Sequence, residues 1–269
     1  MKHLRILSLL TVFFIVFGSC TKVPMTGRKQ LNLLPESDLM SMSLTSYIDF
    51  LSNSKVVTTG EQAEMVNRVG KKIAASVEEY LGKHRQSSRV KDFTWEFNLV
   101  EDATVNAWCM PGGKVVFYTG ILPICADEEG LAVVMGHEIA HAIARHGNER
   151  MSQQLAIQFV GVAGNVALSQ KSDTVQQIFN VAYGLGSTLG VVLPYSRMHE
   201  SEADEMGLMF MAMAGYNPEK APAFWDRMSA AGGAKPPEFL STHPDPSKRA
   251  AKLKEYMPKA LEYYNKTKG

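Results

Sequence analysis

Cysteine is scarce in this chain of 269 residues, and neither sign of charge is in excess. The sequence holds three cysteines, and its 28 basic and 27 acidic side chains leave a formal net charge of +1. A near-neutral chain lacks the electrostatic footprint of a nucleic-acid-binding protein, so we expect no nucleic acid as a partner. No CxxC pair is present that would form a zinc-thiolate site. Cys109 and Cys125 could pair in an oxidising compartment or remain as buried free thiols.

Long apolar runs and internal repeats are missing as well. The apolar stretches at residues 155–168 and 178–193 each fall short of the about 20 residues that a membrane-spanning helix needs. Polar residues 169–174 separate them, so we expect a helical hairpin packed on the domain, with a pair of membrane segments as the alternative. No sequence period marks an appended repeat array.

The first 20 residues have a composition of their own. Lys2 and Arg5 precede an apolar run over residues 6–17, and two small residues stand before Cys20. This order is typical of an export signal, and its end resembles a bacterial lipobox, whose cysteine becomes the lipidated first residue. An ordinary cleaved signal peptide is the alternative. We expect an exported periplasmic lipoprotein, anchored through Cys20 to a membrane, with the outer membrane favoured.

Three segments follow from these observations: an export signal peptide at residues 1–19, a lipidated cysteine with its tether at 20–35, and a single domain at 36–269. Within the domain, the spacing of apolar residues predicts helices over 37–53 and 61–83.

The apolar period changes from helical to alternating between residues 92 and 122. Apolar and polar side chains alternate over 93–99, which predicts a half-buried strand. Pro-Gly-Gly at 111–113 lies between two β-prone runs and predicts a hairpin or a tight corner. The helical period returns at residue 127. The sequence therefore predicts a predominantly helical α+β domain with a small sheet.

The motif His-Glu-Ile-Ala-His at residues 137–141 lies in a run that is apolar nearly all round, with Asp127 as a plausible N-cap. On a helix, His137 and His141 lie about 40° apart around the axis, so both imidazoles can bind one metal ion. Glu138 is offset by about 100°, where it could take a proton from a water that zinc activates. Polar side chains inside a buried helix need partners, and a zinc ion supplies them.

A catalytic zinc ion takes three protein ligands and leaves one position open. The metzincin pattern would place a third histidine at position 147, and it is excluded because Gly147 stands there and His146 is out of register. Between Met151 and His199 the sole acidic residue is Asp173. The third ligand is therefore expected in the acidic run that follows.

On a helix, Glu200 and Asp204 of this run share a face of small residues, whereas Glu202 points toward the far side and is predicted to face solvent. We predict Glu200 as the third zinc ligand. Asp204 would accept a hydrogen bond from a ligand histidine and fix its tautomer. His199 is the alternative ligand, although it lies about 100° from the small-residue face.

HEIAHAIARH, followed by the apolar stretch and then SRxxExEAD, closely resembles the HtpX and CAAX-prenyl-protease (Ste-type) zinc metallopeptidases. Their soluble, periplasmic lipoprotein-like branch, which includes BepA-type proteases, is the most similar. The resemblance extends to residues 24–31 (PMTGRKQL), 106–120 (NAWCMPGGKVVFYTG) and 242–244 (THP). It implies a zincin-like metallopeptidase domain with its small sheet packed on the HExxH helix. The chain departs from the BepA type because no repeat domain follows.

The resemblance implies one zinc ion with a defined set of ligands and a general base: the ligands His137, His141 and Glu200, and the base Glu138. It also implies an edge strand to which an extended substrate pairs, consisting of Lys114, Val115, Val116, Phe117 and Tyr118. It further suggests that His243 lies at the active site, donating to an oxyanion or capping the zinc, with a plain turn histidine as the alternative. Arg197 and Arg249 would order this site.

These inferences predict a zinc metalloendopeptidase that hydrolyses peptide bonds of exported or envelope proteins, in quality control of misfolded chains. The alternative is an envelope assembly or chaperone-like lipoprotein that binds unfolded polypeptides and has a mostly occluded protease site. A structural zinc protein is the weakest reading, because Glu138 would then have no task.

Overall fold

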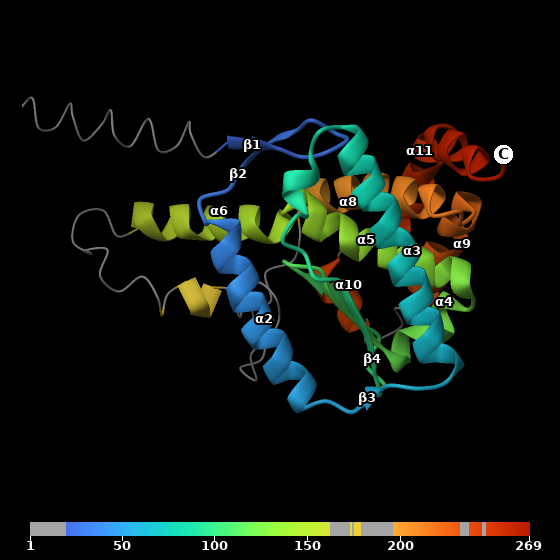
Figure 1. Ribbon diagram of the computed structural model, residues 1–269, viewed down its shortest axis with the longest axis horizontal. Coiled ribbons are helices and arrows are strands. Elements are labelled where there is room, and N and C mark those ends of the chain that lie inside the picture. Colours follow the sequence, from blue (N-terminus) through green and yellow to red (C-terminus); the bar gives the residue numbers. More distant parts are fainter. Residues whose placement is uncertain (1–19, 162–172, 174, 179–195, 232–236, 244–245) are drawn as a thin grey trace, which may run out of the picture.

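The computed structural model describes all of the chain except residues 1–19, 162–172, 174, 179–195, 232–236 and 244–245 (Figure 1). The predicted signal peptide lies outside the described residues, as does most of the apolar hairpin predicted between residues 155 and 193. None of the helices in the described part of the chain combines the length and the apolarity that crossing a membrane requires.

Helices make up most of the described chain, as the sequence predicts, and a small sheet packs against them (Figure 1). The helices are α2 (Glu36–Ser52), α3 (Glu61–Lys83), α4 (Leu122–Cys125), α5 (Glu128–Ala144), α6 (His146–Gly161), α8 (Arg197–Met213), α9 (Ala221–Ala230), α10 (Glu238–Thr242) and α11 (Pro246–Lys266). The predicted ranges of the first two helices are confirmed, with α2 one residue earlier at both ends.

The strands form two sheets. A small hairpin pairs β1 (Cys20–Lys22) with β2 (Lys29–Leu31). The main sheet has four strands in the order β3 (Val56–Val57), β4 (Glu96–Val100), β6 (Lys114–Tyr118) and β5 (Ala107–Met110).

β6 is an interior strand of this sheet. It forms the predicted antiparallel hairpin with β5, in which Met110 lies opposite Lys114. On its other side it pairs in parallel with β4, with Phe97 opposite Val115. The prediction that residues 114–118 form a substrate-binding edge is therefore wrong, because both backbone edges of this strand already pair within the sheet. In the described part of the chain, β5 is the strand at that end of the sheet.

Side chains of β6 alternate between two apolar layers, as strand geometry requires. Val115 and Phe117 join the large core, to which α3 and α5 also belong. Val116 and Tyr118 pack with Tyr47 of α2 on the opposite face. The main sheet therefore lies between α2 and the helices that carry the polar centre described below.

α5 and α8 cross at two glycines. A Cβ atom built on Gly136 would lie 2.7 Å from the carbonyl oxygen of Gly207, and one built on Gly207 would lie 2.8 Å from the amide nitrogen of His137. No larger residue fits without moving one of the helices. The crossing sets the first turn of α8 beside the middle of α5.

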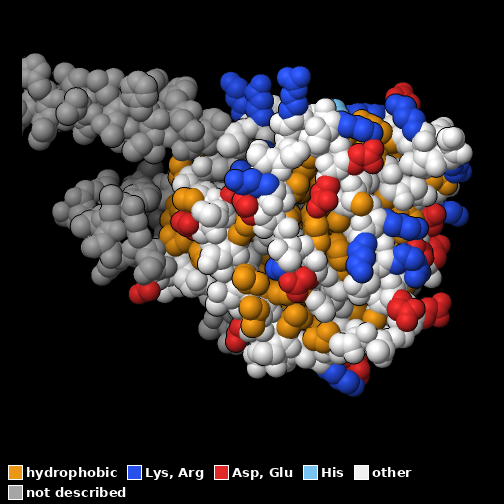
Figure 2. Space-filling view, viewed as in Figure 1, with side chains coloured by type: hydrophobic (Ala, Val, Ile, Leu, Met, Phe, Trp, Pro, Cys, Tyr) orange, Lys and Arg blue, Asp and Glu red, His pale blue; other side chains and the backbone are white. Residues whose placement is uncertain are grey.

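Two further expectations concern cysteine and charge. Cys109 and Cys125 are both buried free thiols, so the disulfide alternative does not apply to this structure. The face shown in Figure 2 carries basic and acidic side chains side by side, in agreement with the near-zero net charge.

Candidate metal centre

α5 carries two histidines and a glutamate into the core. The helix begins after the predicted N-cap Asp127, whose Oδ1 accepts a hydrogen bond from the amide of Gly130. It ends at Arg145, which adopts the left-handed conformation with φ of 60°. Every residue from 130 to 144 is buried, so the polar side chains of the HEIAH motif lie inside the protein.

α8 brings a carboxylate to the same place. Ser196 caps this helix by accepting a hydrogen bond from the amide of His199, and Glu200 lies in the first turn. The close crossing of α5 and α8 sets this carboxylate beside two imidazoles. Its Oε1 lies 3.3 Å from His141 Nε2, and its Oε2 lies 3.5 Å from His137 Nε2.

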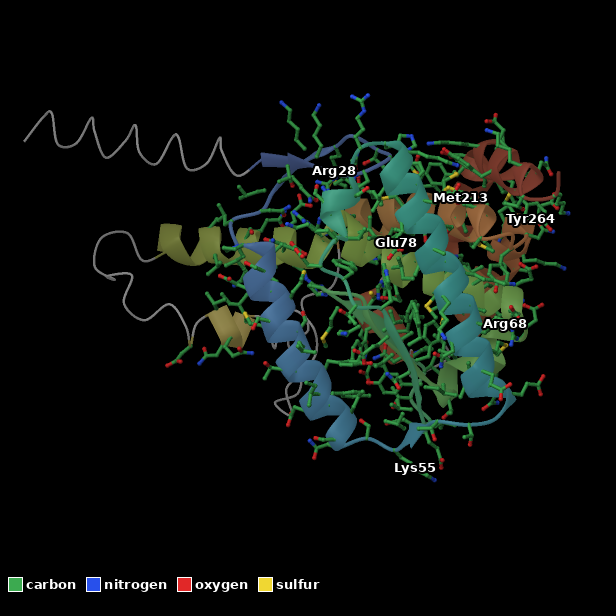
Figure 3. The ribbon with its side chains drawn as sticks, viewed as in Figure 1. Arg28, Lys55, Arg68, Glu78, Met213 and Tyr264 are labelled. Atoms are coloured by element: carbon green, nitrogen blue, oxygen red, sulfur yellow. The ribbon has the colours of Figure 1, made fainter. Side chains whose placement is uncertain are left out.

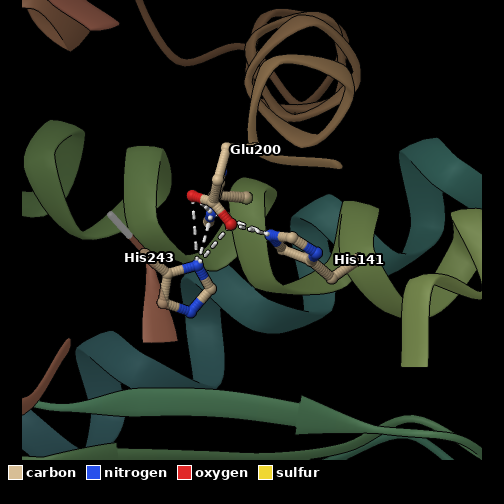
Figure 4. A group of neighbouring side chains, drawn as sticks. His141, Glu200 and His243 are labelled. Carbon is tan, nitrogen blue, oxygen red and sulfur yellow. Dashed lines mark hydrogen bonds and ion pairs between the residues drawn. The ribbon is translucent and has the colours of Figure 1, made fainter. Parts of the chain in front are cut away.

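Four buried side chains, His137, His141, Glu200 and His243, each offer one ligand atom, and these atoms lie within 4.8 Å of one another. Figure 4 shows three of them, His141, Glu200 and His243. The Nε2 atoms of His137 and His141 are 3.0 Å apart, and His243 Nδ1 lies 3.1 Å from Glu200 Oε1. Around a tetrahedral zinc ion with bonds of about 2.0–2.1 Å, ligand atoms lie about 3.3 Å apart. The spacing and the donor types therefore fit zinc.

His243, the C-cap residue that follows α10, enters this group, as the resemblance implies. Its ring stacks on Phe239, with centroids 4.4 Å apart and ring planes at 21°. Its Nδ1 faces Glu200, and its Nε2 lies 3.4 Å from Glu138 Oε1. His243 thus contacts both a predicted ligand, Glu200, and the predicted base, Glu138.

Asp204 and Arg249 surround the ring of His137. Nδ1 of His137 lies 3.1 Å from Asp204 Oδ1, so Asp204 can accept its hydrogen and leave Nε2 for a metal ion. Arg249 Nε donates to Asp204 at 2.8 Å, and Arg249 Nη1 lies 2.8 Å from Glu200 Oε2. Burial raises the pKa of Asp204, but the charge of Arg249 and the hydrogen bond from His137 outweigh it and lower that pKa overall. Arg197 is exposed at the start of α8, outside this buried group.

Glu138 lies beside the predicted ligands and not among them, as helix geometry predicts. Its side chain is buried, and within the described residues its Oε1 has no hydrogen-bond partner. A buried carboxylate oxygen without a hydrogen bond is costly unless a ligand engages it. Burial raises the pKa of Glu138, which brings it toward the range that suits a general acid and base.

Two further residues of the centre escaped prediction from the sequence. Glu202 is 6% exposed and does not face solvent. Its Oε2 lies 2.9 Å from Nε2 of His146, whose Nδ1 lies 2.9 Å from Nδ1 of His141. Burial lowers the pKa of His146 to about 4, so this ring is neutral at pH 7. One sequence signal could have revealed this pair: His146 follows the HEIAH motif closely, directly after Arg145, the residue at which α5 ends.

An HExxH helix, a glutamate from a second helix and a buried candidate base together define a zinc metallopeptidase of the zincin type. The chain belongs to peptidase family M48: the model of Peptidase family M48 matches residues 67–257. The predicted zincin-like fold, the enzyme class of zinc metalloendopeptidase and the zinc cofactor are thereby confirmed at the level of the family.

Curated relatives come from mitochondria and from bacteria. The chain is 33% identical to the mitochondrial metalloendopeptidase OMA1 of Schizosaccharomyces pombe over 88% of this chain and 66% of the relative. With OMA1 of Saccharomyces cerevisiae the identity is 35% over 67% of this chain and 52% of the relative. The beta-barrel assembly-enhancing protease of Escherichia coli is 30% identical over 58% of this chain and 33% of its own length. The chain thus spans between one third and two thirds of these relatives.

These relatives change two predictions. The family is supported, but its HtpX and Ste-type members and the periplasmic lipoprotein branch are not singled out, because the relatives are OMA1 and the Escherichia coli protease. The predicted location, a periplasmic lipoprotein at the outer membrane, is contradicted, because the OMA1 relatives are mitochondrial proteins. Cys20 begins β1, and its lipidation stays a prediction, as do the segment bounds.

Proposed function

We propose that this chain cleaves unfolded or misfolded polypeptides in protein quality control, with His137, His141 and Glu200 as zinc ligands and Glu138 as general base and acid. One observation carries the proposal: a buried carboxylate oxygen of Glu138 lies without a hydrogen bond beside side chains whose spacing fits zinc. A purely structural zinc site would have no use for such a group.

The proposed chemistry uses few groups. A bound zinc ion would polarise the scissile carbonyl and lower the pKa of a water in the site. Glu138 removes a proton from the attacking water and delivers it to the leaving amine. His243, whose Nε2 faces Glu138, donates a hydrogen bond to the oxyanion once substrate is bound. Asp204 holds the ring of His137 in orientation.

β5 takes the place of β6 as the strand proposed to bind an extended substrate. It lies at the end of the sheet in the described part of the chain, and Cys109 and Pro111 line a small cavity together with His141. A peptide that pairs beside β5 would continue the sheet and pass the metal centre. Unfolded segments have free backbone for such pairing, which supports misfolded chains as the substrate class.

A second candidate function, binding of unfolded polypeptides with little cleavage, is favoured by the closure of the site. His137, His141 and His243 are each 2% exposed. α10, which ends directly before His243, is tied to the chain just before β5: the amide of Phe239 donates to the carbonyl of Val105 at 3.0 Å. In this state a polypeptide could contact the surface of the protein without reaching the zinc ligands.

The two candidates are distinguished by incubating zinc-loaded full-length protein with denatured casein. We expect fragments that disappear when zinc is chelated. Glu138→Gln should keep its zinc and lose cleavage by about 100-fold or more, while the exposed control Glu79→Gln should cleave normally. Cleavage by Glu138→Gln at the wild-type rate would remove Glu138 from its proposed role. Stable complexes without fragments in the wild-type protein would favour the binding function.

A further inference from the structure

The loop between β1 and β2 carries Arg28, whose side chain reaches buried residues next to the metal centre. The loop is closed by hydrogen bonds from the amide of Val23 to the carbonyl of Arg28, at 2.8 Å, and from the amide of Gly27 to the carbonyl of Val23, at 3.0 Å. Met25 and Gly27 both have positive φ, of 66° and 70°, which makes the loop tight. The side chain of Arg28 is thereby directed toward α6 and α8 (Figure 3).

Arg28 binds two buried carboxylates from different helices. Its Nη1 and Nη2 donate to the two oxygens of Glu149 in α6, at 2.8 and 2.7 Å. Its Nε donates to Glu202 of α8 at 2.9 Å. The planar guanidinium therefore connects α6, which directly follows the histidine helix, to α8, which carries Glu200. Both carboxylate side chains are only 5% exposed.

Glu202 is held as an ionised acceptor. Arg28 Nε and His146 Nε2 both contact Oε2 of Glu202, and the hydroxyl of Thr26 donates to its Oε1. A guanidinium stays charged and offers donors only, so it pairs with the ionised form of this carboxyl group. An ionised carboxylate accepts hydrogen bonds and donates none. The hydrogen between Glu202 and Nε2 of His146, which are 2.9 Å apart, therefore belongs to the histidine.

The hydrogen bond between Glu202 and His146 sets the tautomer of His141, a proposed zinc ligand that contacts His146. A neutral imidazole has one donor and one acceptor nitrogen, so His146, which donates from Nε2, accepts at Nδ1. That nitrogen lies 2.9 Å from Nδ1 of His141, which must then carry the hydrogen. His141 is left with a bare Nε2, and this is the atom that faces Glu200 at 3.3 Å.

We propose that Arg28 is a positioning residue for the metal centre, which acts through Glu202 and His146 to hold His141 in the tautomer and orientation that bind zinc. Asp204 does the same for His137 from the other side of the centre. The N-terminal hairpin is thus part of the zinc site although it supplies no ligand. The inference rests on the proposed ligand set and not on peptidase activity.

The test is zinc affinity of the zinc-free full chain, measured by competition with a chromogenic chelator. His146→Phe keeps a ring stacked on His199 and removes both nitrogens, so we expect its zinc Kd to rise about 10–100-fold. Arg28→Gln and the milder Arg28→Lys should raise the Kd in the same direction. In the His146→Phe background the Arg28 changes should alter the zinc Kd little further, since the hydrogen-bonded path from Arg28 to His141 is already interrupted.

Imidazole ¹⁵N NMR of the zinc-free protein gives a second readout, in which the Arg28 variants should lose the signal of a single His141 tautomer. Arg68→Gln removes an exposed arginine that binds a single carboxylate, Glu128, through its Nε and Nη2, and it should change neither measurement. If the Arg28→Lys protein is folded, as judged by circular dichroism, and binds zinc with the wild-type Kd, the inference is overturned. The inference would also be overturned if the Arg28 variants weakened zinc binding equally in the wild-type and the His146→Phe backgrounds. A wild-type chain that binds no zinc would refute the ligand set itself, together with this inference.

Discussion

Two acidic residues beneath the centre are held ionised by a cation from a distant part of the chain. Glu149 and Glu202 both have a pKa lowered to about 2, because hydrogen bonds from buried histidines and from Arg28 outweigh the effect of burial. The usual carboxyl pKa is near 4.3, so this pairing stabilises the fold above about pH 4.3 and the stabilisation is lost as the pH falls toward 2.

Arg28→Gln should therefore lower the free energy of unfolding of the zinc-free protein at pH 7 by about 3 kcal/mol, since it removes the cation that neutralises two buried carboxylates. The difference from wild type should shrink between pH 4.5 and about pH 2, as both carboxylates take up protons in the folded and the unfolded state. Urea unfolding at several pH values measures it. The exposed control Arg68→Gln should differ from wild type by less than about 1 kcal/mol throughout. A difference that is constant with pH would contradict this explanation.

Residues within one helix could be placed from the sequence, and their distant partners could not. The relative positions of the residues at 137–141 follow from the rotation of about 100° per residue in a helix. Glu200 and Asp204 could be predicted at the site because they share a helix face of small residues. Glu202 was predicted to face solvent, and it is buried because Arg28, 174 positions earlier in the chain, neutralises it. No local pattern contains a partner at that separation.

The crossing of α5 and α8 sets the distance between Glu200 and the two histidines proposed as zinc ligands. Gly207→Ala would place a methyl group 2.8 Å from the amide nitrogen of His137, so the helices must move apart. We expect a loss of stability of about 1–3 kcal/mol and a zinc Kd at least several-fold weaker. Thermal unfolding and chelator competition measure the two effects.

Gly82→Ala is the matched control. It lies in α3, where an added methyl group would meet the hydroxyl of Ser87 at an ordinary 3.7 Å. We expect no loss of zinc affinity there. If Gly207→Ala also bound zinc like the wild type, the crossing distance would not control the site.

The order of the strands in the main sheet could not be predicted from the sequence pattern of any single strand. Pro-Gly-Gly between two β-prone runs predicted the β5–β6 hairpin, because the two strands are neighbours in sequence. A β-prone run is compatible with an edge strand and with an interior strand. β6 is an interior strand because it pairs in parallel with β4. This pairing depends on the other strands of the sheet and cannot be read from residues 114–118 alone.

For the molecule as a whole, zinc should act as a stabilising ligand. Binding at a free zinc concentration 1,000 times the Kd adds about 4 kcal/mol to the free energy of unfolding, and each kcal/mol moves the Tm of a domain of this size by about 2–4 °C. Glu200→Gln should reduce the zinc-dependent rise in Tm, because a ligand carboxylate is lost. Glu138→Gln, a neighbour outside the ligand set, should retain it. Scanning calorimetry with and without a chelator tests this, and equal shifts in both variants would remove Glu200 from the ligand set.

The separation of the ligands along the chain has a consequence for how the protein matures. His137 and His141 are in place as soon as α5 forms, but the carboxylate reaches them only after α8 has packed across that helix. Contacts between distant segments close late, because the intervening chain must first lose its freedom. A nascent chain that has just exposed the HEIAH motif to solvent therefore lacks a complete site. With the proposed ligand set, zinc binding would follow the packing of α8 on α5, and a newly made chain could not cleave its neighbours before that point.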